Sequence, residues 1–194
     1  MLCGIDEAGR GPLAGPVCAA AVILGDDFLR KNGLALALDD SKKLSEKKRQ
    51  QLNRVIQIEA LAWGIGWVSH KEIDRINILQ ASLLAMKRAY ENLLKKAAKK
   101  NTPLAQNISV IVDGLHAPAI PPPCTALVKA DATVQEVMAA SILAKCARDD
   151  FMEKAALFYP DYGYDKHKGY PTKTHRETLA RLGPSPIQRL SFRF

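Results

Sequence analysis

The chain lacks several features that would assign it to common classes of protein. Its 194 residues include no apolar run long enough for a membrane-spanning helix, which needs about 20 such residues. Its four cysteines, at positions 3, 18, 124 and 146, lie far apart and form no Cys-x-x-Cys pair. We therefore expect reduced cysteines in a cytoplasmic protein, without a disulfide framework or a zinc site. The first expected strand begins at the first residues, which leaves no room for a signal peptide.

Acidic residues are also too few to balance the basic ones. The chain has 20 Asp and Glu against 28 Lys and Arg, which gives a net charge of +8. Such an excess favours a polyanionic partner, with nucleic acid a better match than a membrane. Many basic proteins bind no nucleic acid, so the charge supports this class of partner without establishing it. Basic residues gather in two places, at 42–49 and at 166–173.

Apolar and amphipathic segments alternate in a pattern typical of one α/β domain. A chain of 194 residues is long enough to bury a sizeable core, and it contains neither repeats nor low-complexity segments. The first three strands, with one helix among them, predict an antiparallel meander. Strands are predicted at residues 2–7, 16–24, 60–68, 108–112 and 124–129, and helices at 45–59, 78–100, 133–154 and 174–182.

Three of the predicted helices begin at residues suited to an N-cap. Ser45 precedes the first of them, and its hydroxyl can accept a backbone N–H of the opening turn. Thr-x-x-Glu motifs at residues 133–136 and 174–177 have the form of a capping box. Gly183 follows the last helix and favours its end at that point.

Carboxylates stand at the ends of predicted elements, where metal ligands often lie. Asp6 and Glu7 end the first strand, Asp113 follows the strand at 108–112, and Asp131 lies between a strand and a helix. Converging carboxylates can hold Mg²⁺ ions against a phosphodiester. Each also has an ordinary explanation: a solvated pair, an Asp-Gly turn at Asp113, or a charge at a helix start for Asp131. The glycine-rich run at 9–15 departs from the Gly-x-Gly-x-x-Gly spacing and precedes a strand, so we reject a dinucleotide site.

Six blocks of sequence together resemble bacterial ribonuclease HII, a type 2 ribonuclease H. They occur in the family's order and span nearly the whole chain. The Arg10 form of the first block favours HII over the sister class HIII, whose extra N-terminal domain is not expected here. The blocks are Ile5-Asp6-Glu7-Ala8-Gly9-Arg10-Gly11-Pro12, Asp39-Asp40-Ser41-Lys42-Lys43-Leu44-Ser45, Val112-Asp113-Gly114, Lys129-Ala130-Asp131, Ala139-Ala140-Ser141-Ile142-Leu143-Ala144-Lys145 and Tyr164-Asp165-Lys166-His167-Lys168-Gly169-Tyr170-Pro171-Thr172.

The resemblance implies a fold and a reaction. The fold would be an α/β, ribonuclease H-like mixed five-stranded sheet with flanking helices and a C-terminal helical segment. Residues 1–194 would form one catalytic domain, with 155–194 as a substrate-contacting extension. The implied enzyme is an endonuclease that hydrolyses the RNA strand of RNA–DNA hybrids. It also cuts 5′ of single ribonucleotides in duplex DNA, leaving 3′-hydroxyl and 5′-phosphate ends, and so serves ribonucleotide excision repair and DNA replication.

The resemblance also assigns roles to particular residues. It makes Asp6, Glu7, Asp113 and Asp131 the catalytic ligands of two Mg²⁺ or Mn²⁺ ions. It places Gly9, Arg10 and Gly11 at the ribose and phosphate of an RNA–DNA junction, and Tyr170 against the following deoxyribose. It makes Ser41 and Lys42 a phosphate-binding pair, with Lys145 a weaker candidate for the same task. From the residues alone, Tyr170 could be a half-buried loop aromatic and Ser41-Lys42 a solvated turn.

Two other functions compete with the endonuclease. A non-catalytic nucleic-acid-binding domain of the same fold would gain nothing from four carboxylates near a phosphate, because they would repel it without a metal. A nuclease for DNA alone is disfavoured only by the resemblance at residues 9–11 and Tyr170. The expected partners are RNA–DNA hybrids and ribonucleotide-containing duplexes, and the protein is expected to be a monomer. With no long tail after Arg193, we expect no processivity clamp, no obligate protein partner and no membrane.

Overall fold

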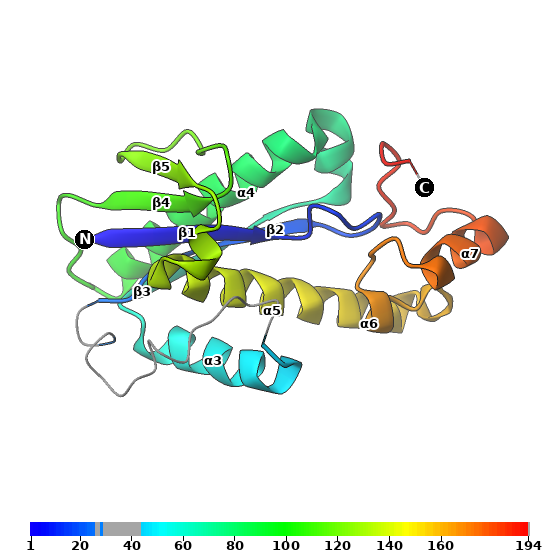
Figure 1. Cartoon of the computed structure of the whole chain (residues 1–194), viewed down its shortest axis with the longest axis horizontal. Coiled ribbons are helices and arrows are strands. Elements are labelled where there is room, and N and C mark those ends of the chain that lie inside the picture. Colours follow the sequence, from blue (N-terminus) through cyan, green and yellow to red (C-terminus); the bar gives the residue numbers. More distant parts are fainter. Residues whose placement is uncertain (26–27, 29–43, 194) are drawn as a thin grey trace.

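A five-stranded mixed sheet forms the centre of the computed structural model, which describes residues 1–25, 28 and 44–193 (Figure 1). The strand order is β3-β2-β1-β4-β5. Strands β1, β2 and β3 form the predicted antiparallel meander, whereas β4 and β5 are added parallel to β1. The strands are β1 (Leu2–Ala8), β2 (Val17–Ile23), β3 (Ala62–Val68), β4 (Ser109–Asp113) and β5 (Cys124–Leu127). The sequence-based prediction of the sheet is therefore confirmed.

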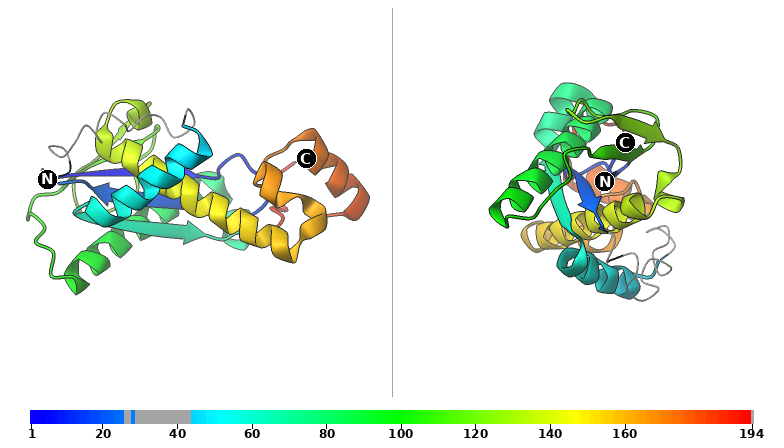
Figure 2. Two further views of the ribbon diagram at one scale, coloured as in Figure 1. Left: turned by 90° about the horizontal axis from the view of Figure 1, so that it is seen from below. Right: turned by 90° about the vertical axis from the view of Figure 1, so that its left-hand side faces the viewer.

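Helices cover both faces of this sheet (Figure 2). Helix α4 (His70–Lys99) packs on one face, α5 (Gln135–Phe158) packs on the other, and α3 (Glu46–Glu59) lies on α5. Strand β2 is buried on both sides: Ala19 and Ala21 face the core under α4, whereas Ala20 and Val22 face the core under α5. This explains why its sequence is almost continuously apolar. None of the helices in the described part of the chain is long and apolar enough to cross a membrane.

The C-terminal helices lie beyond the end of the sheet, where α5 projects past the strands (Figure 1). They are η2 (Pro160–Tyr162), α6 (Tyr164–His167) and α7 (Lys173–Leu182). The fully buried ring of Tyr164 packs with Ala14 and Met152 in a small separate core. The chain then returns toward the sheet, and Gln188 forms an isolated antiparallel bridge with Ala14, outside the five strands. The last residues therefore contact the loop that joins β1 to β2.

Helix α4 begins eight residues earlier than the sequence predicts. Ser69 and Glu72 form a capping box at its start: the Glu72 N–H donates to the Ser69 hydroxyl and the Ser69 N–H to the Glu72 carboxylate. Asn77, with φ of 67° and ψ of 167°, interrupts the helix, and its side chain accepts the Gln80 N–H at 3.1 Å. The predicted start at residue 78 therefore marks the second segment, which Asn77 caps.

Two of the three predicted N-caps are wrong. Ser45 caps α3 as expected, but Thr133 does not cap α5, because its hydroxyl donates to the carbonyl of Lys129 in the preceding 3₁₀ turn. Helix α5 instead begins after Val134 without a side-chain cap and continues to residue 158. Thr172, two residues before the predicted Thr174, caps α7 by accepting the His175 N–H.

Candidate active site

Asp6 and Glu7 lie near the end of β1, the central strand of the sheet. Successive side chains of a strand alternate between its faces. Ile5 belongs to the core under α4, so Asp6 points to the opposite face, where a hydrogen bond joins it to Ser141 of α5. Asp6 is only 5% exposed. The strand thus carries one carboxylate into a nearly buried position between the sheet and α5.

Asp113 approaches the same place from the neighbouring strand. Strand β4 runs parallel to β1 with Ile5 opposite Val112, so Asp113 is level with Asp6. Its Oδ1 accepts the N–H of Ala130 at 2.8 Å. This bond places the 3₁₀ turn η1 (Ala130–Ala132), with buried Asp131, beside the end of β4. The four predicted ligands therefore come from β1, β4 and η1.

The electrostatics of the site show that three of these carboxylates lie close together. Burial raises the pKa of Asp6, and the charges of Glu7 and Asp113 raise it further. The hydrogen bond from Ser141 lowers it. Burial also raises the pKa of Glu7. The charge and hydrogen bond of Arg10 lower this pKa, and the charge of Asp113 raises it. The charges of Asp6, Glu7 and Asp113 thus act on one another, and the backbone places Asp131 beside Asp113.

This cluster carries more negative charge than its surroundings neutralise. The Arg10 guanidinium lies 3.4 Å from Glu7 Oε1, but Oε2 is buried and has no hydrogen-bond partner among the described residues. In the described part of the chain, no group of three or more His, Cys, Asp or Glu side chains is arranged to hold a metal ion. Mg²⁺ needs only one or two carboxylates when waters and substrate phosphates supply its other ligands. The unpaired oxygen and raised pKa values fit a cation of that kind.

A tight loop follows the carboxylates and depends on glycine. Gly9 has φ of +100°, and a Cβ at this position would lie 2.1 Å from Nε of Arg148. Arg148 is 1% exposed and donates to the carbonyls of Pro16, Ala14 and Lys168. Arg10, by contrast, is exposed. The backbone at Gly9 is therefore enclosed by the protein, whereas the next two residues face solvent.

Tyr170 lies beside this loop, although it is about 160 residues away in the sequence. The Leu13 N–H donates to the carbonyl of Gly169 at 2.8 Å. A Cβ at Gly11 would contact the Tyr170 ring at 3.7 Å, and the ring is 41% exposed. The Lys145 ammonium lies 5.8 Å from the ring centroid and pairs with Asp149 at 2.8 Å. The predicted substrate residues Gly11, Tyr170 and Lys145 thus share one surface, next to Gly9 and Arg10.

Two predicted residues lie outside the described part of the chain, and three residues around the site were not predicted. Ser41 and Lys42, the predicted phosphate-binding pair, fall outside the described residues. Sequence reasoning did not connect Ser141 with Asp6, and it gave no role to Arg148 or Arg189. Ser141, Lys145 and Arg148 are spaced i, i+4, i+7 and so share a helix face. That spacing could have connected Ser141 and Arg148 with the predicted residue Lys145, whereas no feature of the sequence pointed to Arg189.

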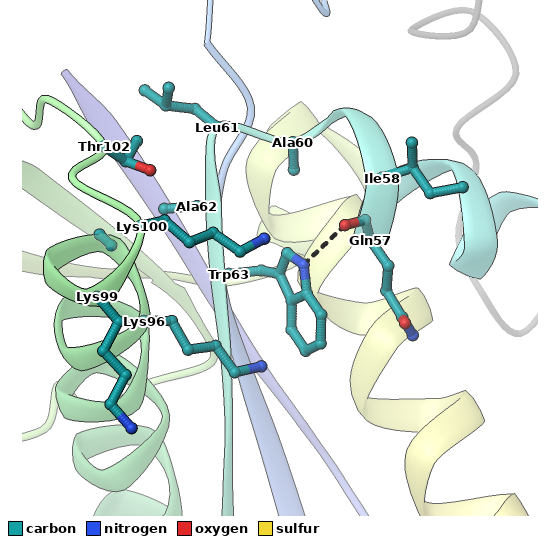
Figure 3. Close-up of a pocket in the computed structure, with 11 residues that line it drawn as sticks. Gln57, Ile58, Ala60, Leu61, Ala62, Trp63, Lys96, Lys99, Lys100 and Thr102 are labelled. Atoms are coloured by element: carbon teal, nitrogen blue, oxygen red, sulfur yellow. Dashed lines mark hydrogen bonds between the residues drawn. The ribbon is translucent and has the colours of Figure 1, made fainter.

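A separate pocket lies at the other end of the sheet and contains none of the predicted site residues (Figure 3). Its volume is about 370 Å³, and it opens near Ala62, the first residue of β3. The Lys96 ammonium lies 3.2 Å over the Trp63 ring, and the indole N–H donates to the Gln57 carbonyl. Lysines at this end of α4 complement the helix dipole. We therefore assign Trp63 to packing and place the candidate active site at the carboxylates.

Comparison with known proteins gives a consistent result. The family model described as ribonuclease HII matches residues 3–194. The ribonuclease HII of Treponema denticola is 55% identical, over 99% of this chain and 98% of that protein. The ribonuclease HII of Dechloromonas aromatica is 49% identical, over 99% of this chain and 90% of that protein.

Solved structures share the fold. Ribonuclease H2 from Pyrococcus horikoshii OT3 superimposes with a TM-score of 0.72 at 26% identity, over 98% of this chain and 93% of that one. The ribonuclease HII in a complex with PCNA from Archaeoglobus fulgidus has a TM-score of 0.68 at 27% identity, over 100% and 96%. Bst-RNase HIII in complex with Mn²⁺ has a TM-score of 0.72 at 17% identity, over 98% and 66%, and supports the fold alone.

Proposed function

The chain belongs to the ribonuclease HII family, and from this premise we propose that it is an endonuclease for RNA in duplexes with DNA. It hydrolyses the RNA strand of RNA–DNA hybrids and cuts 5′ of single ribonucleotides in duplex DNA, leaving 3′-hydroxyl and 5′-phosphate ends. The observation that carries the proposal is the coupled cluster of Asp6, Glu7 and Asp113, with an unpaired Glu7 oxygen, beside a solvent-facing loop.

Asp6, Glu7 and Asp113, with Asp131 completing the acidic set, would hold divalent cations, Mg²⁺ or Mn²⁺. Such ions can activate the attacking water and stabilise the leaving oxygen of a phosphodiester. The protein's own contribution is to orient the ligands, because burial and mutual repulsion disfavour the ionised forms of Asp6 and Glu7 until a cation is bound. The Ser141 hydrogen bond favours the ionised form of Asp6, and the Ala130 N–H fixes one oxygen of Asp113.

Substrate contacts would come from the surface next to the carboxylates. An enzyme that distinguishes RNA from DNA must sense the 2′-hydroxyl. Gly9, Arg10 and Gly11 would approach the ribose and its phosphate through their backbone, and the exposed Tyr170 ring would stack on the next sugar. Lys145, and Ser41 with Lys42, would contact phosphates. Because Tyr170 belongs to residues 155–194, that segment is the proposed substrate-contacting extension of the single domain.

The geometry favours this enzyme over a binding module of the same fold. The raised pKa values of Asp6 and Glu7 show that ionising them is costly, and a binding module would avoid that cost by carrying amides at the same positions. Their presence beside the loop is useful only if a cation neutralises them. A nuclease that cuts DNA alone is disfavoured only by the family match at residues 9–11 and Tyr170.

The test is cleavage of three duplexes of one sequence: all-DNA, DNA with one ribonucleotide, and an RNA–DNA hybrid. Each is incubated with Mg²⁺, with Mn²⁺ or with a chelator, and the product ends are mapped. We expect cutting of the two RNA-containing duplexes only, dependent on metal, with 5′-phosphate ends. Asp6→Asn serves as the inactive control. Equal cutting of the all-DNA duplex, or metal-independent cutting, would contradict the proposal.

A further inference from the structure

We propose that Arg189 is a positioning residue for ribose recognition, because its buried guanidinium turns two backbone N–H groups of the loop outward. The inference rests on the proposed function and adds a residue to it. Arg189 is 0% exposed, and its guanidinium lies inside the loop that follows the carboxylates. It does not itself face solvent, so its effect on a substrate must pass through the loop.

All five N–H donors of the guanidinium are used on the same loop. Nε donates to the carbonyl of Gly15 at 2.8 Å, and the two terminal nitrogens donate to four more carbonyls between 2.6 and 3.1 Å. Arginine has five such donors in a fixed planar arrangement. The complete set of acceptors is the carbonyls of Gly9, Arg10, Pro12, Gly15 and Pro16. The loop is therefore folded around one side chain.

The direction of these carbonyls fixes the direction of the amides. In a trans peptide the C=O and the following N–H point to opposite sides, and the described part of the chain has no cis peptide. The carbonyls of Gly9 and Arg10 point inward to Arg189, so the N–H groups of Arg10 and Gly11 point outward. Neither N–H donates to any described residue. Both residues are exposed, which leaves two adjacent donors open to a ligand.

The next amide along the loop shows where the outward side faces. The carbonyl of Pro12 accepts from Arg189, and the N–H of Leu13 on the far side of that peptide donates to Gly169, next to Tyr170. The outward side of the loop is therefore the side of the Tyr170 ring. Two free amide donors beside a stacking aromatic fit an oxygen-rich ligand such as a ribose hydroxyl with its phosphate.

Arg189 is held in place independently of the guanidinium. Its own N–H donates to the carbonyl of Leu13, and the N–H of Gly15 donates to Ile187. The Asp74 carboxylate of α4 accepts the N–H groups of Leu190 and Ser191. The side chain therefore enters the loop from a fixed backbone, and a shorter or less branched cation at this position would leave several loop carbonyls unsatisfied.

The experiment compares Arg189→Lys with Arg148→Lys. Arg148 is equally buried, packs against Gly9 and Tyr170, and also donates to loop carbonyls, but to those of Ala14 and Pro16 and not to Gly9 or Arg10. Each variant is combined with Asp6→Asn to prevent cutting. Affinities are then measured for a DNA duplex with one ribonucleotide and for the all-DNA duplex of the same sequence. We expect Arg189→Lys to lose about tenfold or more of the preference for the ribonucleotide, and to lose more of it than Arg148→Lys does, even if both variants melt lower.

In the cutting-competent enzyme, Arg189→Lys should raise KM for the one-ribonucleotide duplex more than it lowers kcat, because the carboxylates are unchanged. A folded Arg189→Lys variant with unaltered ribose preference overturns the proposal. Failure of the parent enzyme to prefer or cut ribonucleotides would instead overturn the proposed function, so the two failures are distinguishable.

A measurement on the unaltered protein covers the case in which Arg189→Lys does not fold. The backbone amides of Arg10 and Gly11 should exchange hydrogen quickly in the free protein, because they donate to no described residue. They should become protected when the one-ribonucleotide duplex binds in the presence of Ca²⁺, and less so with the all-DNA duplex. Amides that are already protected in the free protein would refute the outward orientation, and amides equally protected by both duplexes would refute their role in ribose recognition.

Discussion

Replacing Gly9 with alanine tests whether the loop after β1 is fixed as tightly as its geometry indicates. The added Cβ would lie 2.1 Å from Nε and 2.4 Å from Cδ of Arg148. Arg148 has little freedom to move, because it is fully enclosed and donates to three carbonyls. The loop or the arginine must therefore shift, and a buried hydrogen bond of a charged group is the first interaction at risk.

Gly114→Ala is the matched control. Gly114 has φ of +103°, close to the +100° of Gly9, but a Cβ there would meet nothing within 4 Å. Both substitutions carry the backbone strain of a positive φ, which costs roughly 1–2 kcal/mol for an L residue. Only Gly9→Ala adds overpacking, which costs roughly 1–3 kcal/mol. The difference in free energy of unfolding between the two variants measures the enclosure of Gly9 by Arg148.

Thermal unfolding followed by circular dichroism supplies the measurement. In a domain of this size, 1 kcal/mol shifts Tm by about 2–4 °C. We therefore expect Gly9→Ala to melt about 2–12 °C below Gly114→Ala, with both below the parent protein. If the two variants melt within about 1 °C of each other, the loop accommodates the methyl group freely. Arg148 would then not confine the backbone at Gly9, and the argument for a rigid loop would fail.

Three further predictions address the carboxylates, the aromatic ring and a buried histidine. Asp6→Asn should abolish cutting. It should also raise the Tm of the metal-free protein, because burial and the charges of Glu7 and Asp113 oppose ionisation of Asp6. A lower Tm with normal cutting would contradict both claims. Tyr170→Ala should slow cutting at a single ribonucleotide about tenfold or more, since stacking is worth roughly 1–3 kcal/mol. Its Tm should change little, because the ring is 41% exposed. Loss of activity only in proportion to unfolding would make Tyr170 a packing residue. Burial lowers the pKa of His175 below 6.5, so the unfolded chain takes up the proton first and stability should fall as the pH drops below about 6.5. His175→Asn keeps a donor for the Tyr170 carbonyl and should flatten this pH dependence of the free energy of unfolding in urea titrations. An unchanged pH dependence would refute the prediction.

The sheet was predictable because its strands carry their burial in the sequence. Residues 16–24 are apolar at nearly every position, and β2 is indeed covered on both faces. The caps were less predictable, because a threonine can satisfy more than one backbone group. At Thr133 the hydroxyl donates to a carbonyl of the preceding 3₁₀ turn, and the Thr-x-x-Glu spacing contains no sign of that turn. A capping motif thus predicts a helix more reliably than its first residue.

The carboxylate cluster was partly predictable for a topological reason. Asp6 and Asp113 both lie at the ends of apolar strands, and parallel neighbours in register bring such ends together. Glu7 follows from its place beside Asp6. Asp131 depends instead on the path of a 3₁₀ turn after β5, which no periodicity specifies. Its place in the acidic set stays a prediction, as do the roles of the substrate residues.

Arg189 marks the limit of what such reasoning can reach. An arginine near the end of a basic chain reads as a surface charge, because burying a guanidinium is costly without partners. The cost is offset here chiefly because five carbonyls of one loop converge on it, without a carboxylate at ion-pair distance in the described part of the chain. That convergence requires positive φ at Gly9 and Gly15 and the return of the chain after α7 to the loop between β1 and β2. Each condition is a property of the folded backbone, so the arginine and the loop that it organises become visible together, in three dimensions only.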